Sequence, residues 1–207
     1  MLRLLDAEEH APSAVRTGER AMQTHVADSL VALELELVRG ARRIADLGSG
    51  VGFPGLALAV ALPQAEVSLV ESQSRRCEFL GRVCAGAGVE NAHVVRARAE
   101  EWHEGASRQD LVVARALAQQ SVVLEYAAPL LGIGGALVDW RGRRDPTAEA
   151  AADRAAATLG MSREEVRRVV PFEGATDRHL HVFVKTTATP ARFPRRPGIA
   201  RKRPLGG

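Results

Sequence analysis

The chain has 207 residues, a formal net charge of +3 and 46% hydrophobic residues, a composition that suits one domain with a sizeable core. The longest apolar runs fall far short of the roughly 20 residues that cross a bilayer, and the start of the sequence is not a cationic-then-apolar secretory pattern. We therefore expect a cytoplasmic, monomeric protein that makes no membrane contact.

The two cysteines and six histidines predict neither a disulfide nor a metal site. Cys77 and Cys84 lie on one predicted helix, about 10 Å apart along its axis, which is too far for a disulfide. His179 and His181 are two residues apart on a predicted strand, and the other histidines show no metal-ligand spacing. We expect reduced cysteines and no metal.

Residues 1–40 predict an N-terminal helical segment packed on the core, with its clearest helix at 22–33. From residue 42 onward strands and helices alternate. The strands are predicted at 42–48, 66–72, 92–97, 110–116, 135–141, 164–172 and 178–186, and the helices at 54–62, 73–87, 99–104, 119–131 and 146–159. This alternation is typical of an α/β fold with a mostly parallel sheet covered on both faces.

The last two predicted strands are joined by only "EGATD", residues 173–177. Five residues are too few for a crossover helix, so these strands must pair antiparallel. The predicted domain, residues 41–187, therefore has a seven-stranded sheet that is parallel except for one reversed strand near its edge.

The stretch "ADLGSGVGFPG", residues 45–55, follows the first predicted strand and leads into a helix. Glycines at 48, 50 and 52 allow a tight turn and close approach to a ligand, and the helix start presents free N–H groups. The simplest alternative is that the glycines only ease the turn. A dinucleotide site is another, because Gly50, Gly52 and Gly55 fit GxGxxG, which would suit a nicotinamide-dependent oxidoreductase.

Three acids favour S-adenosylmethionine over a dinucleotide. Asp46, directly before the loop, would repel a pyrophosphate but attract an ammonium group. Glu71 ends the second predicted strand at a distance suited to ribose hydroxyls, and Glu100 follows the third, where an adenine would lie. The alternative for Glu100 or Glu101 is a solvated acid in a first helical turn.

Several segments resemble one family of proteins. They are "DLGSGVGFPGLALAVALP", "VESQSRRCEFL", "VVRARAEEW" and "ARALA", with "HVADSL" at 25–30 and "DRHLHVFVK" at 177–185. The chain resembles class I (Rossmann-like) S-adenosylmethionine-dependent methyltransferases. Within them it is similar, over roughly residues 22–186, to the RsmG (GidB) family, guanine-N7 methyltransferases of 16S ribosomal RNA.

The resemblance implies which residues contact the cofactor. Together with the loop and its acids, the predicted cofactor-binding residues are Asp46, Gly48, Gly50, Gly52, Phe53, Glu71, Ala99, Glu100 and Arg115. Arg115 is also the one candidate for a catalytic role, since it ends the fourth predicted strand and could reach cofactor or RNA; the alternative is a salt bridge to a neighbouring acid.

The residues after the fourth strand bear on the reaction. They read "ARALAQQ", without the polar-Pro-Pro-aromatic loop that goes with methylation of exocyclic amines. Both cysteines lie on the helix after the second strand, away from where a nucleophile for pyrimidine C5 methylation would be needed. N7 of guanine has an available lone pair and loses no proton, so its methylation needs no general base and can rest on alignment.

The partner implied by the resemblance is 16S rRNA, as a 30S subunit or an assembly intermediate. Candidate RNA-binding residues are Arg141, Arg143, Arg144, Arg178, Arg195, Arg196, Arg201, Lys202 and Arg203. The last five belong to residues 188–207, a basic tail with four prolines that we expect to be extended and mobile. It would serve either solubility or phosphate contacts. The short segment before His25 leaves a non-catalytic RNA-binding protein as an alternative.

Overall fold

The computed structural model describes residues 19–207, with side chains from residue 23 onward. The predictions for residues 1–18 lie outside this range. The described chain begins with helix α2 (Glu19–Leu30), the 3-10 turn η1 (Val31–Glu34) and α3 (Glu36–Gly40). Buried Val31, Leu35 and Val38 join one core cluster with residues of the first strands, so these turns pack on the sheet.

Seven strands form one sheet. They are β1 (Arg43–Leu47), β2 (Glu66–Glu71), β3 (Ala92–Arg96), β4 (Gln109–Arg115), β5 (Leu131–Arg141), β6 (Met161–Arg168) and β7 (His179–Lys185). Their order is β3-β2-β1-β4-β5-β7-β6, and β7 runs antiparallel to both of its neighbours. The predicted α/β fold with one reversed strand near the edge is confirmed.

Strand β6 begins and ends earlier than the predicted strand at 164–172. Gly160, in the left-handed conformation at φ 78°, ends the preceding helix, so the strand can begin at Met161. Beyond Arg168 the segment reaches Pro171, which has no N–H to donate to a strand ladder.

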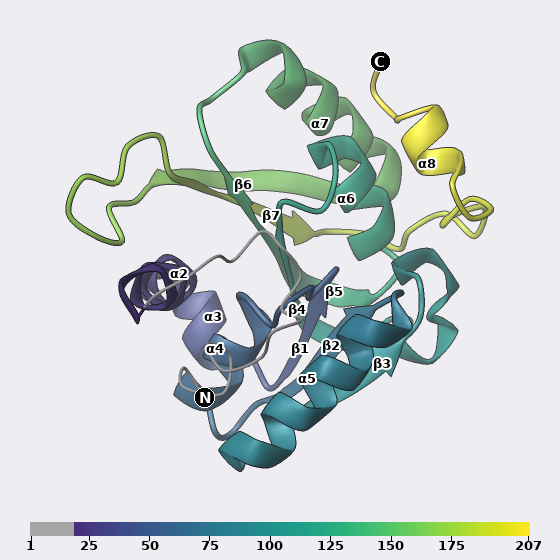
Figure 1. Ribbon diagram of the computed structural model, residues 1–207. Helices are drawn as coiled ribbons and strands as arrows, with labels where there is room; N and C mark the ends of the chain where they lie inside the picture. The colour runs from purple at the N-terminus through teal and green to yellow at the C-terminus, as the bar shows by residue number, and fades with distance from the viewer. Residues whose placement is uncertain (1–18) are drawn as a thin grey trace.

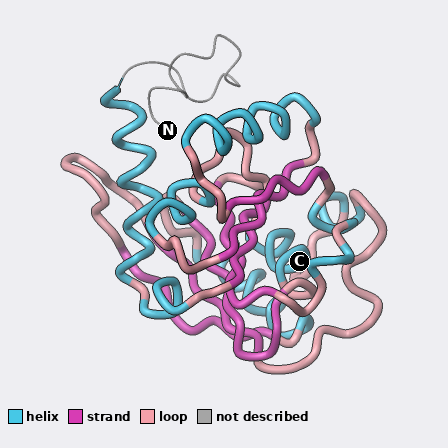
Figure 2. The backbone as a smooth tube through the Cα atoms, turned by 90° about the horizontal axis from the view of Figure 1, so that it is seen from below, coloured by secondary structure: helices cyan, strands magenta, loops and turns pink. Residues whose placement is uncertain are grey.

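Helices cover both faces of the sheet (Figures 1 and 2). One face carries α4 (Gly55–Ala61) and α5 (Ser74–Ala87) with the N-terminal turns; the other carries α6 (Gln120–Ala127), α7 (Pro146–Leu159) and the one-turn α8 (Ile199–Lys202). Along β4 successive buried residues alternate between the two core clusters, Leu111 and Val113 in one and Val112 and Ala114 in the other. This is the pattern of a strand buried on both sides.

The C-terminal segment, residues 188–207, is packed on the domain, contrary to the mobile tail that we expect from its sequence. Phe193 and Ala200 are 8% and 3% exposed and belong to the core cluster on the α6 side. The prolines limit regular structure to the single turn of α8, but they leave the apolar side chains free to pack. The basic composition of the segment does not indicate that Phe193 and Ala200 are buried.

Candidate functional site

The glycine loop between β1 and α4 turns at the carboxyl end of the sheet. Gly48 has a φ of +71°, and its N–H donates to the carbonyl of Val70 on β2 at 2.8 Å. A Cβ on Gly48 would lie 2.6 Å from Cδ1 of Leu117. Glycine is needed here both for its conformation and for the close approach of the chain after β4.

Asp46 lies beneath this loop. Its side chain is buried, and Oδ2 accepts a hydrogen bond from Gly55 N–H at 3.0 Å. Burial raises the pKa of this carboxyl to about 6, against the hydrogen bonds from Gly55 and Ser49 that lower it. Asp46 lines neither of the two cavities described below, and its hydrogen bond to Gly55 holds the start of α4.

A smaller cavity of about 240 Å³ lies beside the loop and holds two buried carboxylates, those of Glu71 and Glu100. Oε2 of Glu71 accepts from Gly50 N–H at 3.1 Å, and Oε1 accepts from Gln73 N–H at 2.8 Å. Ala99 also lines this cavity. Backbone N–H groups thus hold Glu71 where the second strand ends, as predicted from its position.

A larger cavity of about 580 Å³ adjoins the first, since Gly48, Arg76 and Ala116 line both. Its walls come from the glycine loop, from α2 and from the ends of β4 and β5. Guanidinium and ring groups dominate it. They belong to His25, Phe53, Arg76, Arg115, Trp140, Arg141, Phe172 and Arg178.

Asp28 on α2 organises this larger cavity. Arg115 Nη1 donates to Asp28 Oδ2 at 2.8 Å, and Arg178 Nε lies 3.5 Å from Oδ1. Trp140 Nε1 donates to the backbone carbonyl of Asp28 at 2.7 Å. These contacts hold α2 against the ends of β4 and β5. Arg115 thus forms a salt bridge with an acid, which was the alternative role considered for it.

The rings of His25 and Phe53 are stacked, with centroids 5.8 Å apart and planes 20° from parallel. The Arg115 guanidinium lies 5.7 Å from the Phe53 centroid. Burial, followed by the charge of Arg115, lowers the pKa of His25, which therefore presents a neutral ring at pH 7. The result is an aromatic wall next to a cation, an arrangement on which a planar ring can stack.

The residues of the smaller cavity fit S-adenosylmethionine. Glu71 offers acceptors for ribose hydroxyls and Glu100 an acceptor for the adenine amino group. Next to Glu71, Gly50 lines the larger cavity, and a Cβ there would meet only the Gly48 carbonyl oxygen, at 3.7 Å. Gly48 borders both this cavity and the larger one.

Comparison with known proteins decides the family. The family described as rRNA small subunit methyltransferase G (GidB) matches residues 7–181. The chain belongs to this family. It is 38% identical over 198 residues to "Ribosomal RNA small subunit methyltransferase G" of Rubrobacter xylanophilus, covering 93% of this chain and 76% of that one. It is 38% identical over 188 residues to the protein of the same name from Syntrophomonas wolfei, covering 89% and 86%.

Solved structures agree on the fold. The mitomycin 7-O-methyltransferase MmcR superposes with a TM-score of 0.65 at 14% identity, covering 80% of this chain and 55% of that one. A point mutant of MtNAS, solved in complex with S-adenosylmethionine, gives a TM-score of 0.62 at 16% identity, covering 90% and 70%. The predicted resemblance is confirmed, and the protein is an S-adenosylmethionine-dependent methyltransferase.

Within this family fold, the structure sorts the predicted cofactor residues into groups. Glu71, Ala99 and Glu100 line the smaller cavity; Gly48 lines both. Gly50, Phe53 and Arg115 line the larger cavity, and neither Asp46 nor Gly52 lines either. A Cβ on Gly52 would meet Leu56 and Leu80 at 3.1–3.2 Å, so Gly52 serves loop packing.

Sequence reasoning did not assign His25 or Asp28 to the site, and it placed Arg201 among the RNA-binding candidates instead of at the cofactor cavity. The first two belong to the segment "HVADSL", and their spacing of three places them on the same face of a helix. That spacing could have marked them as a pair. Arg201 lines the smaller cavity, and no local pattern predicts this, because the docking of the C-terminal segment brings it there.

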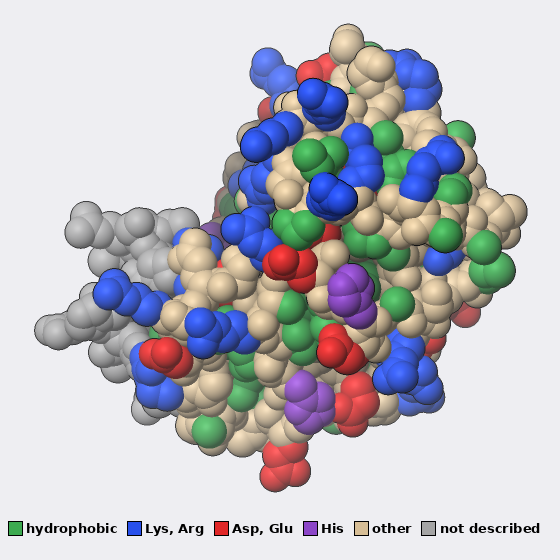
Figure 3. Space-filling view, turned by 90° about the vertical axis from the view of Figure 1, so that its right-hand side faces the viewer, with side chains coloured by type: hydrophobic (Ala, Val, Ile, Leu, Met, Phe, Trp, Pro, Cys, Tyr) green, Lys and Arg blue, Asp and Glu red, His purple; other side chains and the backbone are tan. Residues whose placement is uncertain are grey.

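The candidate RNA-binding cations differ in their availability. Arg141 donates to buried Asp139 at 2.6 Å, Arg144 to Glu149 at 2.6 and 2.9 Å, and Arg195 to buried Glu125 at 2.5 and 2.8 Å. Arg195 is thereby an anchor of the C-terminal segment. Apart from Arg178 beside Asp28, the remaining candidates are Arg143, Arg196, Arg201, Lys202 and Arg203, and all five are exposed. Figure 3 shows Lys and Arg side chains gathered over the upper half of the face that carries α8.

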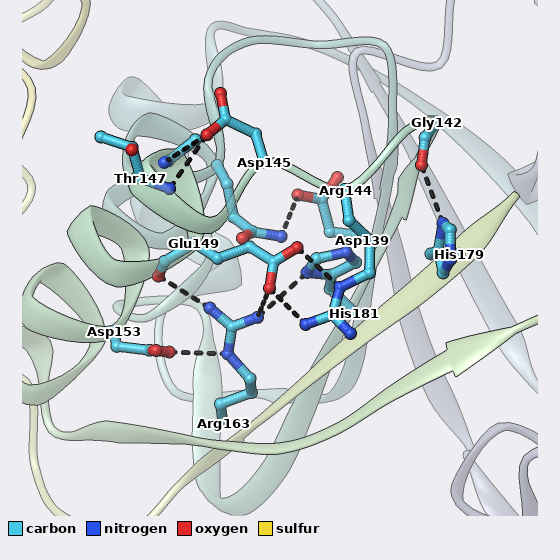
Figure 4. A network of polar contacts seen from close by, with 12 residues as sticks. Asp139, Gly142, Arg144, Asp145, Thr147, Glu149, Asp153, Arg163, His179 and His181 are labelled. Atoms are coloured by element: carbon cyan, nitrogen blue, oxygen red, sulfur yellow. Dashed lines mark hydrogen bonds and ion pairs between the residues drawn. The ribbon is translucent and has the colours of Figure 1, made fainter. Parts of the chain in front are cut away.

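A polar network joins α7 to strands β6 and β7 (Figure 4). Glu149 accepts from Arg144 and from Arg163, and Arg163 also donates to Asp153 at 2.6 Å. Burial lowers the pKa of neighbouring His181 to about 4. The network includes Arg144 of the loop after β5, and the first residue of that loop, Gly142, lines the larger cavity next to Arg141.

Among residues 19–207, no helix is long and apolar enough to span a membrane, and no three His, Cys, Asp or Glu side chains are grouped to hold a metal ion. Cys77 and Cys84 are both buried and unpaired, in keeping with the prediction that they form no disulfide.

Proposed function

We propose that the protein transfers a methyl group to N7 of a guanine in 16S rRNA, acting on the small ribosomal subunit or an assembly intermediate. The observation that carries the proposal is the pair of adjoining cavities, one with carboxylates that suit adenosine and one with rings and guanidinium groups that suit a nucleotide. Membership of the family supports an rRNA substrate, and it leaves the nicotinamide alternative without support.

The larger cavity suits guanine in particular. Guanine presents N1–H and an N2 amino group on its Watson–Crick edge, and a carboxylate is the side chain that accepts from both. Asp28 is such a carboxylate: its Oδ2 accepts from Arg115, and its Oδ1 accepts no hydrogen bond among the described residues, with Arg178 as an ion-pair partner at 3.5 Å. The His25 and Phe53 rings supply a face against which the base can stack.

The proposed reaction needs no general acid or base from the protein. Bound S-adenosylmethionine supplies an electrophilic methyl group on a positively charged sulfur. N7 already carries a lone pair and releases no proton, so the task of these residues is to hold base and cofactor in line across Gly48. Such alignment can contribute about 7–11 kcal/mol to lowering a barrier. Arg115 and Asp28 then position the base, with no proton transferred.

Methyl transfer tests this directly. Labelled methyl from S-adenosylmethionine is followed into small-subunit rRNA, free and in 30S particles, from cells that lack their own enzyme. We expect incorporation of one methyl group per rRNA. Cofactor binding without incorporation into either substrate would instead support the non-catalytic RNA-binding alternative.

A further inference from the structure

The C-terminal segment reaches the cofactor cavity, although the family match ends at residue 181. Its anchor is the pair of hydrogen bonds from Arg195 to Glu125, a side chain that is 1% exposed. The Arg195 backbone N–H adds a third at 3.1 Å. Phe193 and Ala200 are buried on either side of this anchor. The segment is therefore held at a fixed place beside α6.

From this anchor the chain makes two contacts at the smaller cavity. Gly198 N–H donates to Oε1 of Glu100 at 3.2 Å. Arg201 Nη2 donates to the carbonyl of Leu117, in the chain after β4, at 3.1 Å. Arg201 lines the cavity together with Glu71, Glu100 and Tyr126. The segment thus contributes to the wall of the same cavity as the two acids.

We propose that this segment completes the adenosine subsite and that Arg201 covers the adenine ring. The inference rests on the proposed cofactor site. A guanidinium group is planar and stacks on aromatic faces, which an ammonium group does not do in the same way. The Gly198 contact uses one oxygen of Glu100 and leaves Oε2 to accept from the adenine amino group. Segment docking and cofactor binding therefore stabilise each other.

The neighbouring residue Lys202 provides a matched control. It lies one position further along α8, carries the same charge, is exposed and does not line the cavity. Arg201→Ala and Lys202→Ala each remove one positive charge from the same exposed turn. The difference in ligand affinity between the two variants therefore reports the contact of Arg201 with the ligand, because the change in the charge of the segment is the same in both.

The test is calorimetric binding of S-adenosylhomocysteine and of 5′-methylthioadenosine, which lacks the amino-acid part, to the full chain and both variants. We expect Arg201→Ala to weaken both ligands by the same factor, about tenfold, and Lys202→Ala to leave both affinities unchanged. Equal losses in the two variants, or none in Arg201→Ala, would overturn the inference.

Hydrogen exchange of the full chain gives a second readout that needs no substitution. Saturating S-adenosylhomocysteine should slow the exchange of backbone amides in residues 195–203, because the ligand and the segment stabilise each other. Unchanged exchange in a protein that binds the ligand would refute the coupling while leaving the methyltransferase assignment intact. A full chain that binds neither ligand would overturn the proposed function itself.

Discussion

The two cavities meet at Gly48 but hold their carboxylates differently. In the smaller cavity the nearest partners of Glu71 and Glu100 are backbone N–H groups, with the Arg76 guanidinium 3.6 Å from Glu71, whereas in the larger one the nearest partner of Asp28 is the guanidinium of Arg115, with that of Arg178 3.5 Å away. Backbone donors fix an acid and leave it able to accept from hydroxyl and amino groups. Guanidinium partners neutralise the acid and leave a cationic surface for a polyanion.

The largest effect is expected outside both cavities, at Asp46 beneath the glycine loop, and it concerns stability. Because its pKa is raised to about 6, this group stabilises the folded protein below about pH 4, and that contribution is lost as the pH rises through 6. Asp46→Asn keeps an acceptor for Gly55 and removes the buried charge. We expect a gain of up to about 3 kcal/mol in unfolding free energy at pH 7, vanishing near pH 4.

Denaturant unfolding of both proteins at several pH values measures this difference. Cofactor affinity should be nearly unchanged, because Asp46 lines neither cavity. A large loss of affinity in Asp46→Asn would place this side chain in the cofactor site after all.

The smaller cavity is tested by Glu71→Ala. Loss of the charge-assisted ribose contact and of the loop anchor at Gly50 should weaken S-adenosylhomocysteine binding by about 1.5–3 kcal/mol, as measured by calorimetry. RNA affinity should change little. Glu101→Ala, which removes a half-exposed acid nearby, is the control. An equal loss of affinity in Glu101→Ala would mean that the loss in Glu71→Ala comes from the change in net charge and not from a lost contact.

The larger cavity is tested by Asp28→Asn. The amide retains one acceptor but turns a donor toward the N1–H and amino group of guanine, so kcat/KM for RNA should fall about tenfold. The KM for S-adenosylmethionine should stay near the wild-type value. A rise in the KM for S-adenosylmethionine, with kcat/KM for RNA unchanged, would show instead that the larger cavity binds the cofactor.

The smallest effect is expected at Arg143, which is exposed beside the larger cavity. Arg143→Ala should lower the slope of log affinity for rRNA against log salt by about 0.7, the value for one phosphate contact on a single strand. Filter binding at several salt concentrations measures it. An unchanged slope would remove Arg143 from the RNA surface.

Local patterns in the sequence predicted much of the fold and the cofactor side of the site. The alternation of strands and helices predicted a mostly parallel sheet of seven strands. The glycine loop follows the end of β1, and Glu71 is the last residue of β2. Periodicity is short-range, so it could not reveal which distant segments meet. The role of Asp28 depends on α2 lying beside the ends of β4 and β5, where Arg115 and Trp140 donate to Asp28. That of Arg201 depends on the burial of Phe193 and Ala200 within a basic segment.

The most direct test of the central claim is the chemical identity of the product. Small-subunit rRNA methylated by this protein would be digested to nucleosides and analysed by mass spectrometry against standards, with strand cleavage at 7-methylguanine giving the position. The account predicts 7-methylguanosine alone, at a single site. Label in N2-methylguanosine, in a C5-methylated pyrimidine or in a 2′-O-methylated ribose would contradict it, because each of those products requires a proton to leave the acceptor.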